Sequence, residues 1–521
     1  MYVNEQLYLG LADGQPVNMA LNMANRHGLI AGASGTGKTI TMKVMAESFS
    51  DAGVPVFLCD VKGDVSGLAM PGVSSSGMEK RIDKFGLRDS FRYTSYPVTF
   101  WDIYQSAGHP IRATVSDMGP DLLSRILGLT EAQEGVLNIA FRIADDNQLD
   151  LIDLKDLRAM LTYLDEHKKE YTMTYGNITT QSLGGILRAL LPLENQGGDL
   201  FFGEPDLDIN DWIRTAADGR GMINLLDCVQ LVQNPTLYAS FLLWMMSELF
   251  EMLPEAGDMD KPKLVFFFDE AHLLFSEAPK VLVQKIEQVV KLIRSKGVGI
   301  YFVTQSPSDI PDSVLAQLSN RVQHALRAYT PAEQKAVRAA AQSMRPNPAF
   351  KAEEAIMELG VGQALVSLLD EDGVPGIVQR TAIICPQSLM APADSAARAA
   401  ALAGDGMGKY DQSVDNDSAF ELLQEMQAEE EEKAQLAAER AQLEKERAEF
   451  EKQKAKQEEA ARRKAEKEVE RQMAAREKAA ERRKAQIERQ LINTGASLLK
   501  KGLQRGLMNT LSGSSKRKSR W

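Results

Sequence analysis

The sequence has few of the residues that form covalent or metal cross-links, with 3 cysteines and 5 histidines in 521 residues. Cys59, Cys228 and Cys385 are more than 150 residues apart and the histidines are scattered, so neither a disulfide framework nor a structural zinc site is indicated. The N-terminal segment lacks the basic-then-apolar pattern of a signal peptide, and the apolar stretch 237–250 is too short and too interrupted to span a bilayer. We therefore expect a cytoplasmic protein.

The formal net charge of −12 is distributed unevenly along the chain. Residues 411–459 are rich in Asp and Glu, whereas residues 460–521 are rich in Lys and Arg. The acidic balance argues against nonspecific nucleic-acid binding by the whole surface. It leaves open a basic lining inside a ring, or a basic tail.

The most specific motif is GASGTGKT at 32–39, which matches the phosphate-binding pattern G-x-x-x-x-G-K-[ST]. It follows an apolar run and precedes a helical pattern. Glycines let backbone N–H groups converge on an anion, and the helix N-terminus adds a positive dipole. Lys38 is expected to contact the β- and γ-phosphates of ATP, and the Thr39 hydroxyl to ligate Mg²⁺. The residues predicted to bind the nucleotide are Gly32, Ser34, Gly35, Thr36, Gly37, Lys38 and Thr39.

A second motif, LVFFFDEAH at 264–272, supplies two carboxylates. Its apolar residues predict a strand buried on both faces, which delivers Asp269 and Glu270 to the edge where α/β sheets bind ligands. Asp269 would hold Mg²⁺, mainly through water, and Glu270 would polarise the attacking water. The alternative is that the pair only caps the following helix.

Three further polar residues are candidates for the same reaction. Gln305 follows the apolar run 299–304, so it is expected beside the carboxylates as a sensor of the γ-phosphate; the alternative is a polar residue that satisfies the backbone at the strand end. Arg294 and Arg321 flank this run, and either is a candidate for the cation that a neighbouring subunit supplies to a phosphoryl-transfer transition state. The alternative for each is a solvated surface arginine.

Asp60 ends another buried run, 54–59, and is followed by Lys62 and Asp64. Two interpretations of this residue are equally supported. Asp60 would stand behind the ligands of Mg²⁺, or it would cap the turn that DVKGD is suited to form.

Hydrophobic periodicity divides the chain into segments. Apolar runs separated by helical patterns predict an α/β fold with a mostly parallel sheet, and 91–93 and 98–101 are short strand candidates. We expect an N-terminal part of a P-loop ATPase core (1–116), an inserted helical subdomain (117–215), the C-terminal part of the core with a closing hairpin (216–385), a linker (386–418), a charged long helix or coiled coil (419–490), and a basic amphipathic tail (491–521).

The last two segments suggest partners. Leu436, Leu443 and Phe450 recur at seven-residue spacing, which is typical of a short coiled coil. In the tail, leucines recur on a four-residue grid among lysines and arginines. This pattern fits an interfacial helix or a basic docking peptide for membrane or nucleic acid, or a helix that packs on its own protein.

Taken together, these segments resemble the HerA/FtsK superfamily of ring-forming P-loop ATPases, and more narrowly the bacterial HerA-type helicase C-terminal-domain proteins, over about residues 1–390. The resemblance is carried by GLIAGASGTGKT, LCDVKGD, LVFFFDEAH, SKGVGIYFVTQSPSDIP and GQALVSLLDEDGVP. It implies a RecA-like core, homo-oligomeric hexameric rings and ATP bound between subunits. Only about 30 residues precede the phosphate loop, too few for the β-barrel domain of HerA itself, so a partnership with the HerA nuclease is not expected.

By position, the residues that match the motif residues of these ATPases are Lys38, Thr39, Asp269, Glu270 and Gln305. Arg294 matches a position where they carry a functional arginine, and Arg321 follows their asparagine-containing turn. Two hypotheses follow: a Mg²⁺-dependent ring ATPase that translocates or unwinds DNA, or a regulatory or assembly ATPase that acts on a protein partner through the coiled coil. Recruitment to a membrane surface by the tail is a third.

Overall fold

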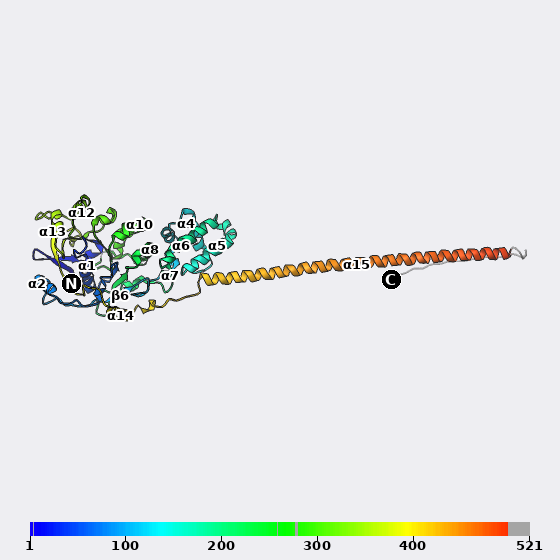
Figure 1. Ribbon diagram of the computed structural model, residues 1–521, viewed down its shortest axis with the longest axis horizontal. Coiled ribbons are helices and arrows are strands. Elements are labelled where there is room, and N and C mark those ends of the chain that lie inside the picture. The colour runs from blue at the N-terminus through cyan, green and yellow to red at the C-terminus, as the bar shows by residue number, and fades with distance from the viewer. Residues whose placement is uncertain (4, 258, 277–279, 499–521) are drawn as a thin grey trace. The chain divides into compact units, whose positions relative to one another are not determined.

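A computed structural model describes residues 1–3, 5–257, 259–276 and 280–498. The chain divides into two units, Met1–Met426 and the residues from Gln427 onward. All elements of the site considered below belong to the first unit, whose helices and strands are labelled in Figure 1.

The first unit is organised around a 12-stranded sheet, counted over the described residues. Its strands are β1 (Tyr2–Val3), β2 (Gln6–Ala12), β3 (Gln15–Ala20), β4 (Gly28–Ala31), β5 (Val56–Asp60), β6 (Val98–Trp101), β7 (Ile223–Asp227), β8 (Leu264–Phe268), β9 (Val298–Thr304), β10 (Asn320–His324), β11 (Gln363–Ser367) and β12 (Gln379–Ile383). The parallel part has the order β10-β4-β9-β8-β5-β7-β6. Beyond β10, the strands β11, β12 and β2 pair antiparallel, and β1 and β3 both pair with β2. The predicted α/β fold with a mostly parallel sheet is confirmed.

The sheet lies between two hydrophobic cores, which explains why its central strands are apolar runs rather than alternating patterns. Phe57 and Phe266 belong to one core, whereas their neighbours Val56 and Val265 belong to the other. The α-helices are α1 (Lys38–Asp51), α2 (Ser76–Lys84), α3 (Val115–Ile126), α4 (Glu131–Asp146), α5 (Leu154–Tyr175), α6 (Thr180–Asn195), α7 (Gly198–Phe201), α8 (Pro235–Met252), α9 (His272–Ser276), α10 (Lys280–Leu292), α11 (Asp312–Leu315), α12 (Pro331–Gln342), α13 (Ala352–Glu358), α14 (Ser395–Gly404) and α15 (Ala419–Leu498). Short 3-10 helices are η1 (Leu21–Arg26), η2 (Ser66–Ala69), η3 (Ile209–Trp212), η4 (Leu231–Gln233), η5 (Ile293–Lys296), η6 (Pro307–Asp309) and η7 (Gly408–Tyr410).

The predicted helical insertion is present as α3 to α7, and α4, α5 and α6 group together beside the sheet in Figure 1. Capping boxes at Thr130 and Asp153 start α4 and α5, because each side chain accepts a hydrogen bond from the first helical turn. Leu137 and Leu157 share one continuous core with Phe266 of the sheet. The insertion is therefore packed onto the ATPase core rather than separated from it, and its exact boundaries stay a prediction.

Two shorter segments differ from the sequence-based expectation. Residues 91–93 form no strand, whereas the strand expected at 98–101 is present as β6. Within 386–418, which we expected as a linker, α14 and η7 form, and several side chains of this stretch contact the core. The composition of that segment, rich in Ala, Gly and Ser, does not reveal these contacts.

The second unit consists, in its described part, of the continuation of α15. Every side chain described from Gln427 to Leu491 is exposed, including the predicted seam residues Leu436, Leu443 and Phe450. Their pairing in a coiled coil stays a prediction. Among the described residues, no helix combines the length and apolar character that crossing a bilayer requires. Most of the basic tail, 499–521, lies outside the described residues.

Candidate active site

The phosphate loop connects β4, in the middle of the parallel sheet, to α1. Three of its glycines, Gly32, Gly35 and Gly37, have positive φ angles of 156°, 75° and 117°, which a residue with a Cβ adopts only with strain. The loop is held to the two strands beside β4, because Gly32 N donates to Thr304 O at 3.2 Å and Ala33 N to Ala325 O at 2.8 Å. The predicted loop conformation therefore follows from its glycines and its position between β9 and β10.

Lys38 is the first residue of α1 and is buried. Its Nζ donates to the carbonyl oxygens of Gly32 at 2.7 Å and Ala33 at 3.3 Å, which fixes the ammonium group across the loop. Burial lowers the pKa of Lys38, and the nearby Glu270 carboxylate partly opposes this shift. Thr39 follows at the start of the same helix, half-buried, where its hydroxyl is available to a cation bound at the loop.

Asp269 follows the last residue of β8 and is 3% exposed. Its Oδ2 atom has no hydrogen-bond partner among the described residues, which is rare for a buried carboxylate. Burial raises the pKa of Asp269 to about 7, against the lowering effect of Lys62. An orphaned buried oxygen fits an unfilled role as ligand, direct or through water, of a divalent cation. No cluster of three His, Cys, Asp or Glu suited to a metal exists in the described ranges, so Mg²⁺ would take its other ligands from Thr39, phosphate and water.

Glu270 lies next to Asp269 and is contacted by three side chains. Its Oε1 pairs with Lys62, its Oε2 accepts from Gln305 Nε2 at 3.4 Å, and His272 Nδ1 lies 3.2 Å from Oε2. Burial alone would raise the pKa of Glu270, but the hydrogen bond and charge of Lys62 outweigh it, so the net shift is downward. The carboxylate is therefore ionised and ready to accept a proton.

The backbone at Glu270 is unusual. Its φ is 46°, the left-handed region that a non-glycine residue enters only when its surroundings enforce it. Gln305, at the end of the adjacent β9, lies beside the carboxylate, as we expected from strand order. A strained glutamate between a lysine and a glutamine is a more specific arrangement than a helix cap.

The two candidate arginines lie away from this cluster. Arg294 precedes β9 and Gln305 follows it, so the two residues are at opposite edges of the sheet, roughly 20 Å apart along a seven-residue strand. Arg321 is the second residue of β10, paired with Leu29. Its guanidinium donates to the carbonyl oxygens of Leu318 at 2.9 Å and Leu315 at 3.0 Å. Neither arginine joins Lys38 and Glu270 within one chain, and their roles stay predictions.

Asp60 takes up the turn-capping arrangement. Its carboxylate accepts from the backbone N–H groups of Gly63 at 2.8 Å and Val65 at 3.1 Å, and burial raises its pKa to about 6. This turn places Lys62 against Glu270. The motif DVKGD in the sequence contained the lysine, but the pairing depends on β5 and β8 being neighbours in the sheet.

Sequence reasoning missed His324, the last residue of β10, which is fully buried behind the phosphate loop. Its Nδ1 lies 3.0 Å from Gln363 O, and its Nε2 lies 2.8 Å from Thr41 Oγ1. Since a carbonyl oxygen only accepts, Nδ1 carries the hydrogen and Nε2 accepts from the threonine. Burial lowers the pKa of His324 to about 4, which keeps the ring neutral.

With this geometry described, comparison with known proteins decides the family. Residues 6–517 match the family model described as helicase HerA-like C-terminal. The chain belongs to this HerA-like family. Together with its phosphate loop and strand-end carboxylates, membership makes it a HerA-like P-loop ATPase, as the sequence resemblance predicted.

Solved structures with a similar arrangement include conjugation ATPases. The plasmid coupling protein TrwB in complex with GDPNP aligns with the HerA-like chain at a TM-score of 0.49 and 14% identity, covering 75% of this chain and 93% of that one. VirB4 of Thermoanaerobacter pseudethanolicus aligns at a TM-score of 0.46 and 14% identity, covering 74% and 97%. No curated protein sequence matches the HerA-like chain significantly.

Proposed function

We propose that this HerA-like protein hydrolyses ATP with Mg²⁺ and uses the energy to move along or unwind DNA as a homo-oligomeric, hexameric ring. The observation that carries the proposal is the position of Glu270. Its ionised carboxylate lies at the carboxyl edge of the sheet, beside buried Asp269 and in contact with Gln305. A nucleotide store needs no base at this position, whereas hydrolysis does.

Each residue of the cluster has a defined task in this proposal. The loop N–H groups and Lys38 bind and orient the phosphates, and Glu270 accepts a proton from the attacking water. Thr39 and Asp269 would hold Mg²⁺, which neutralises charge on the phosphates when bound. Lys62 keeps Glu270 ionised, and Gln305 contacts it from the next strand. A change in the ATP γ-phosphate therefore reaches β9 through Gln305.

The placement of the arginines supports a ring. Arg294 and Arg321 lie towards the edge of the sheet opposite the phosphate loop, so a transition-state cation from either must come from another copy. Repeated head-to-tail contacts of this kind close into rings. The family description as a helicase supports a nucleic-acid polymer as the partner.

The test is the ATPase rate of the full chain with and without DNA, at low and moderate salt. We expect stimulation by DNA that weakens as salt rises, because phosphate contacts release counterions. Lys38→Ala should lose ATP binding, and Glu270→Gln should bind ATP but lose at least about a hundredfold in rate. Absence of DNA stimulation at both salt concentrations would contradict the translocase, and full turnover by Glu270→Gln would contradict the assignment of the base.

A second candidate function, ATPase activity directed at a protein partner, is favoured by one observation. α15 exposes Leu436, Leu443 and Phe450 on one seam. Apolar residues at heptad spacing on an exposed helix are suited to a second helix. If DNA leaves the rate unchanged while a chain ending at Met426 loses an activity or a binding partner that the full chain has, this candidate replaces the first.

A further inference from the structure

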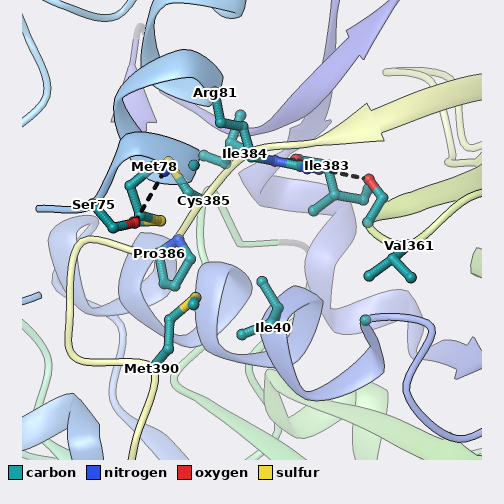
Figure 2. A pocket seen from close by; sticks show the side chains of 13 residues that line it. Ile40, Ser75, Met78, Arg81, Val361, Ile383, Ile384, Cys385, Pro386 and Met390 are labelled. Carbon is teal, nitrogen blue, oxygen red and sulfur yellow. Dashed lines mark hydrogen bonds between the residues drawn. The ribbon is translucent and has the colours of Figure 1, made fainter. Parts of the chain in front are cut away.

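A cavity of about 350 Å³ opens directly beside the first turn of α1. It begins at Gly37 of the phosphate loop and is enclosed by α2 and by the chain that follows β12. Figure 2 shows Ile40, Met78, Pro386 and Met390 projecting toward it from these three segments. We call it the α1–α2 slot. Its size lies at the lower end of the range for small-molecule sites.

The walls of the slot are mainly apolar. Ile40, Met78, Pro386 and Met390 present aliphatic and thioether groups, which suit the face of a flat aromatic ring. Arg81 also lines the slot, but its guanidinium donates to Gly362 O at 2.7 Å and Ile383 O at 2.6 Å. These bonds tie the arginine to the wall, so a second anionic group is not what the slot is built to bind.

The outer wall is fixed to the same helix that carries Lys38. Buried Glu47, on α1, accepts from the backbone N–H groups of Gln387 at 2.8 Å and Ser388 at 2.9 Å. Buried Lys43, one turn earlier, donates to the Leu389 carbonyl oxygen. Charged groups this deeply buried persist only when hydrogen-bonded. They hold residues 386–390 at a set distance from α1, so the slot is formed before a ligand enters.

We propose that the α1–α2 slot holds the purine base of the nucleotide whose phosphates lie on residues 32–39. This inference rests on the proposed ATP hydrolysis and adds the part of the site that recognises the nucleoside. Continuity carries it: Gly37 belongs both to the loop and to the slot, and Ile40 lies one residue beyond Thr39. The base is held by contact of its faces with apolar side chains, while the phosphates are held by the loop.

The test compares ATP with inorganic tripolyphosphate, which carries the phosphates without a base. Binding of each to the full chain with Mg²⁺ is measured by calorimetry for wild type, Met78→Trp, Met390→Glu and the control Met173→Trp. Met173 is 91% exposed on α5, away from the slot. Met78→Trp fills the slot, and Met390→Glu places a charge at its more exposed wall, so the second variant is expected to fold even if the first does not.

We expect both slot variants to weaken ATP binding at least about tenfold and to leave tripolyphosphate binding within about twofold of wild type. The control should change neither. Unchanged ATP affinity in both slot variants, or an equal loss of ATP and tripolyphosphate, would overturn the slot as the base site. If wild type binds neither ligand, the proposed function fails first, and the slot fails with it.

Discussion

At the scale of single residues, the phosphate loop depends on a close approach between Gly32 and His324. A Cβ at position 32 would lie 2.5 Å from the His324 Cβ and 3.1 Å from its Cα, closer than packed carbon atoms come. The histidine has no room to yield, because Thr41 and the Gln363 carbonyl oxygen hold both ring nitrogens. The loop is therefore shaped from behind by a neutral, immobilised imidazole.

We predict that Gly32→Ala weakens ATP binding at least about tenfold, because the loop must move away from β10 to relieve the clash. Gly14→Ala is the matched control: Gly14 also has a positive φ, of 80°, but nothing lies within 4 Å of its added Cβ. The control should lose about 1 kcal/mol of stability and no ATP affinity. Calorimetric titration with ATP checks both variants, and wild-type affinity in Gly32→Ala would contradict the role of His324.

The residues of the site differ in how far the sequence alone reveals them. Lys38, Asp269 and Glu270 are recognisable because local motifs encode the loop and the end of a buried strand. Gln305 could be placed beside Glu270 because the apolar run before it predicted a neighbouring strand. His324 and the Lys62–Glu270 pair were not predictable, since both depend on which strands lie side by side. That order is set by packing across the whole sheet.

At the scale of elements, the segment between β12 and α15 is fastened to the core by a buried histidine. His109 Nδ1 lies 2.6 Å from Asp411 Oδ1, and its Nε2 lies 3.1 Å from both carboxylate oxygens of Asp405. Burial alone lowers the pKa of His109, but the hydrogen bonds and charges of Asp405 and Asp411 raise it by more, so the net shift is upward. The imidazolium form is thus the one that closes the clasp.

The clasp predicts a definite dependence of stability on pH. Because the folded-state pKa is raised above the unfolded value of about 6.5, the stabilisation is complete below about pH 6.5 and is lost as pH rises through the folded-state pKa. His109→Gln should therefore lower stability by about 1–3 kcal/mol at low pH and by less at high pH. Thermal unfolding of both proteins across pH checks this.

A second variant tests the same clasp. Asp411→Asn removes one of the two carboxylate partners while leaving Asp405 in place. It should flatten part of the pH dependence that His109→Gln abolishes. A difference between wild type and His109→Gln that stays constant from acid to alkaline pH would contradict the assignment.

Hydrophobic pattern predicted most elements but not this segment. The runs at β4, β5, β8 and β9 are apolar because both faces of the strands are buried, and the helices α3 to α6 show the helical period because one face meets the core. Residues 386–418 have no such pattern. Their attachment uses single polar contacts such as Glu47 with Ser388 and His109 with Asp411. Contacts of this kind leave no periodic trace in a sequence.

At the scale of the whole molecule, each chain holds a site that is complete except for a transition-state cation. Arg321 is engaged with the carbonyl oxygens of Leu315 and Leu318, and burial lowers its pKa. Arg294 is half-buried at the sheet edge opposite the phosphate loop. We therefore favour Arg294 as the residue that one subunit presents to the next, and Arg321 as a residue that stabilises its own β10.

Mixing inactive subunits tests this assignment. Arg294→Ala and Lys38→Ala chains should each be inactive alone. Mixed in equal amounts, they should recover up to about a quarter of the wild-type rate, because about that share of interfaces pairs an intact loop with a neighbour's intact arginine. Glu270→Gln mixed with Lys38→Ala is the control and should recover nothing, since Lys38 and Glu270 act within one chain. Recovery with Arg321→Ala instead would exchange the two roles, and recovery with neither would mean that the site is completed without a neighbour's arginine.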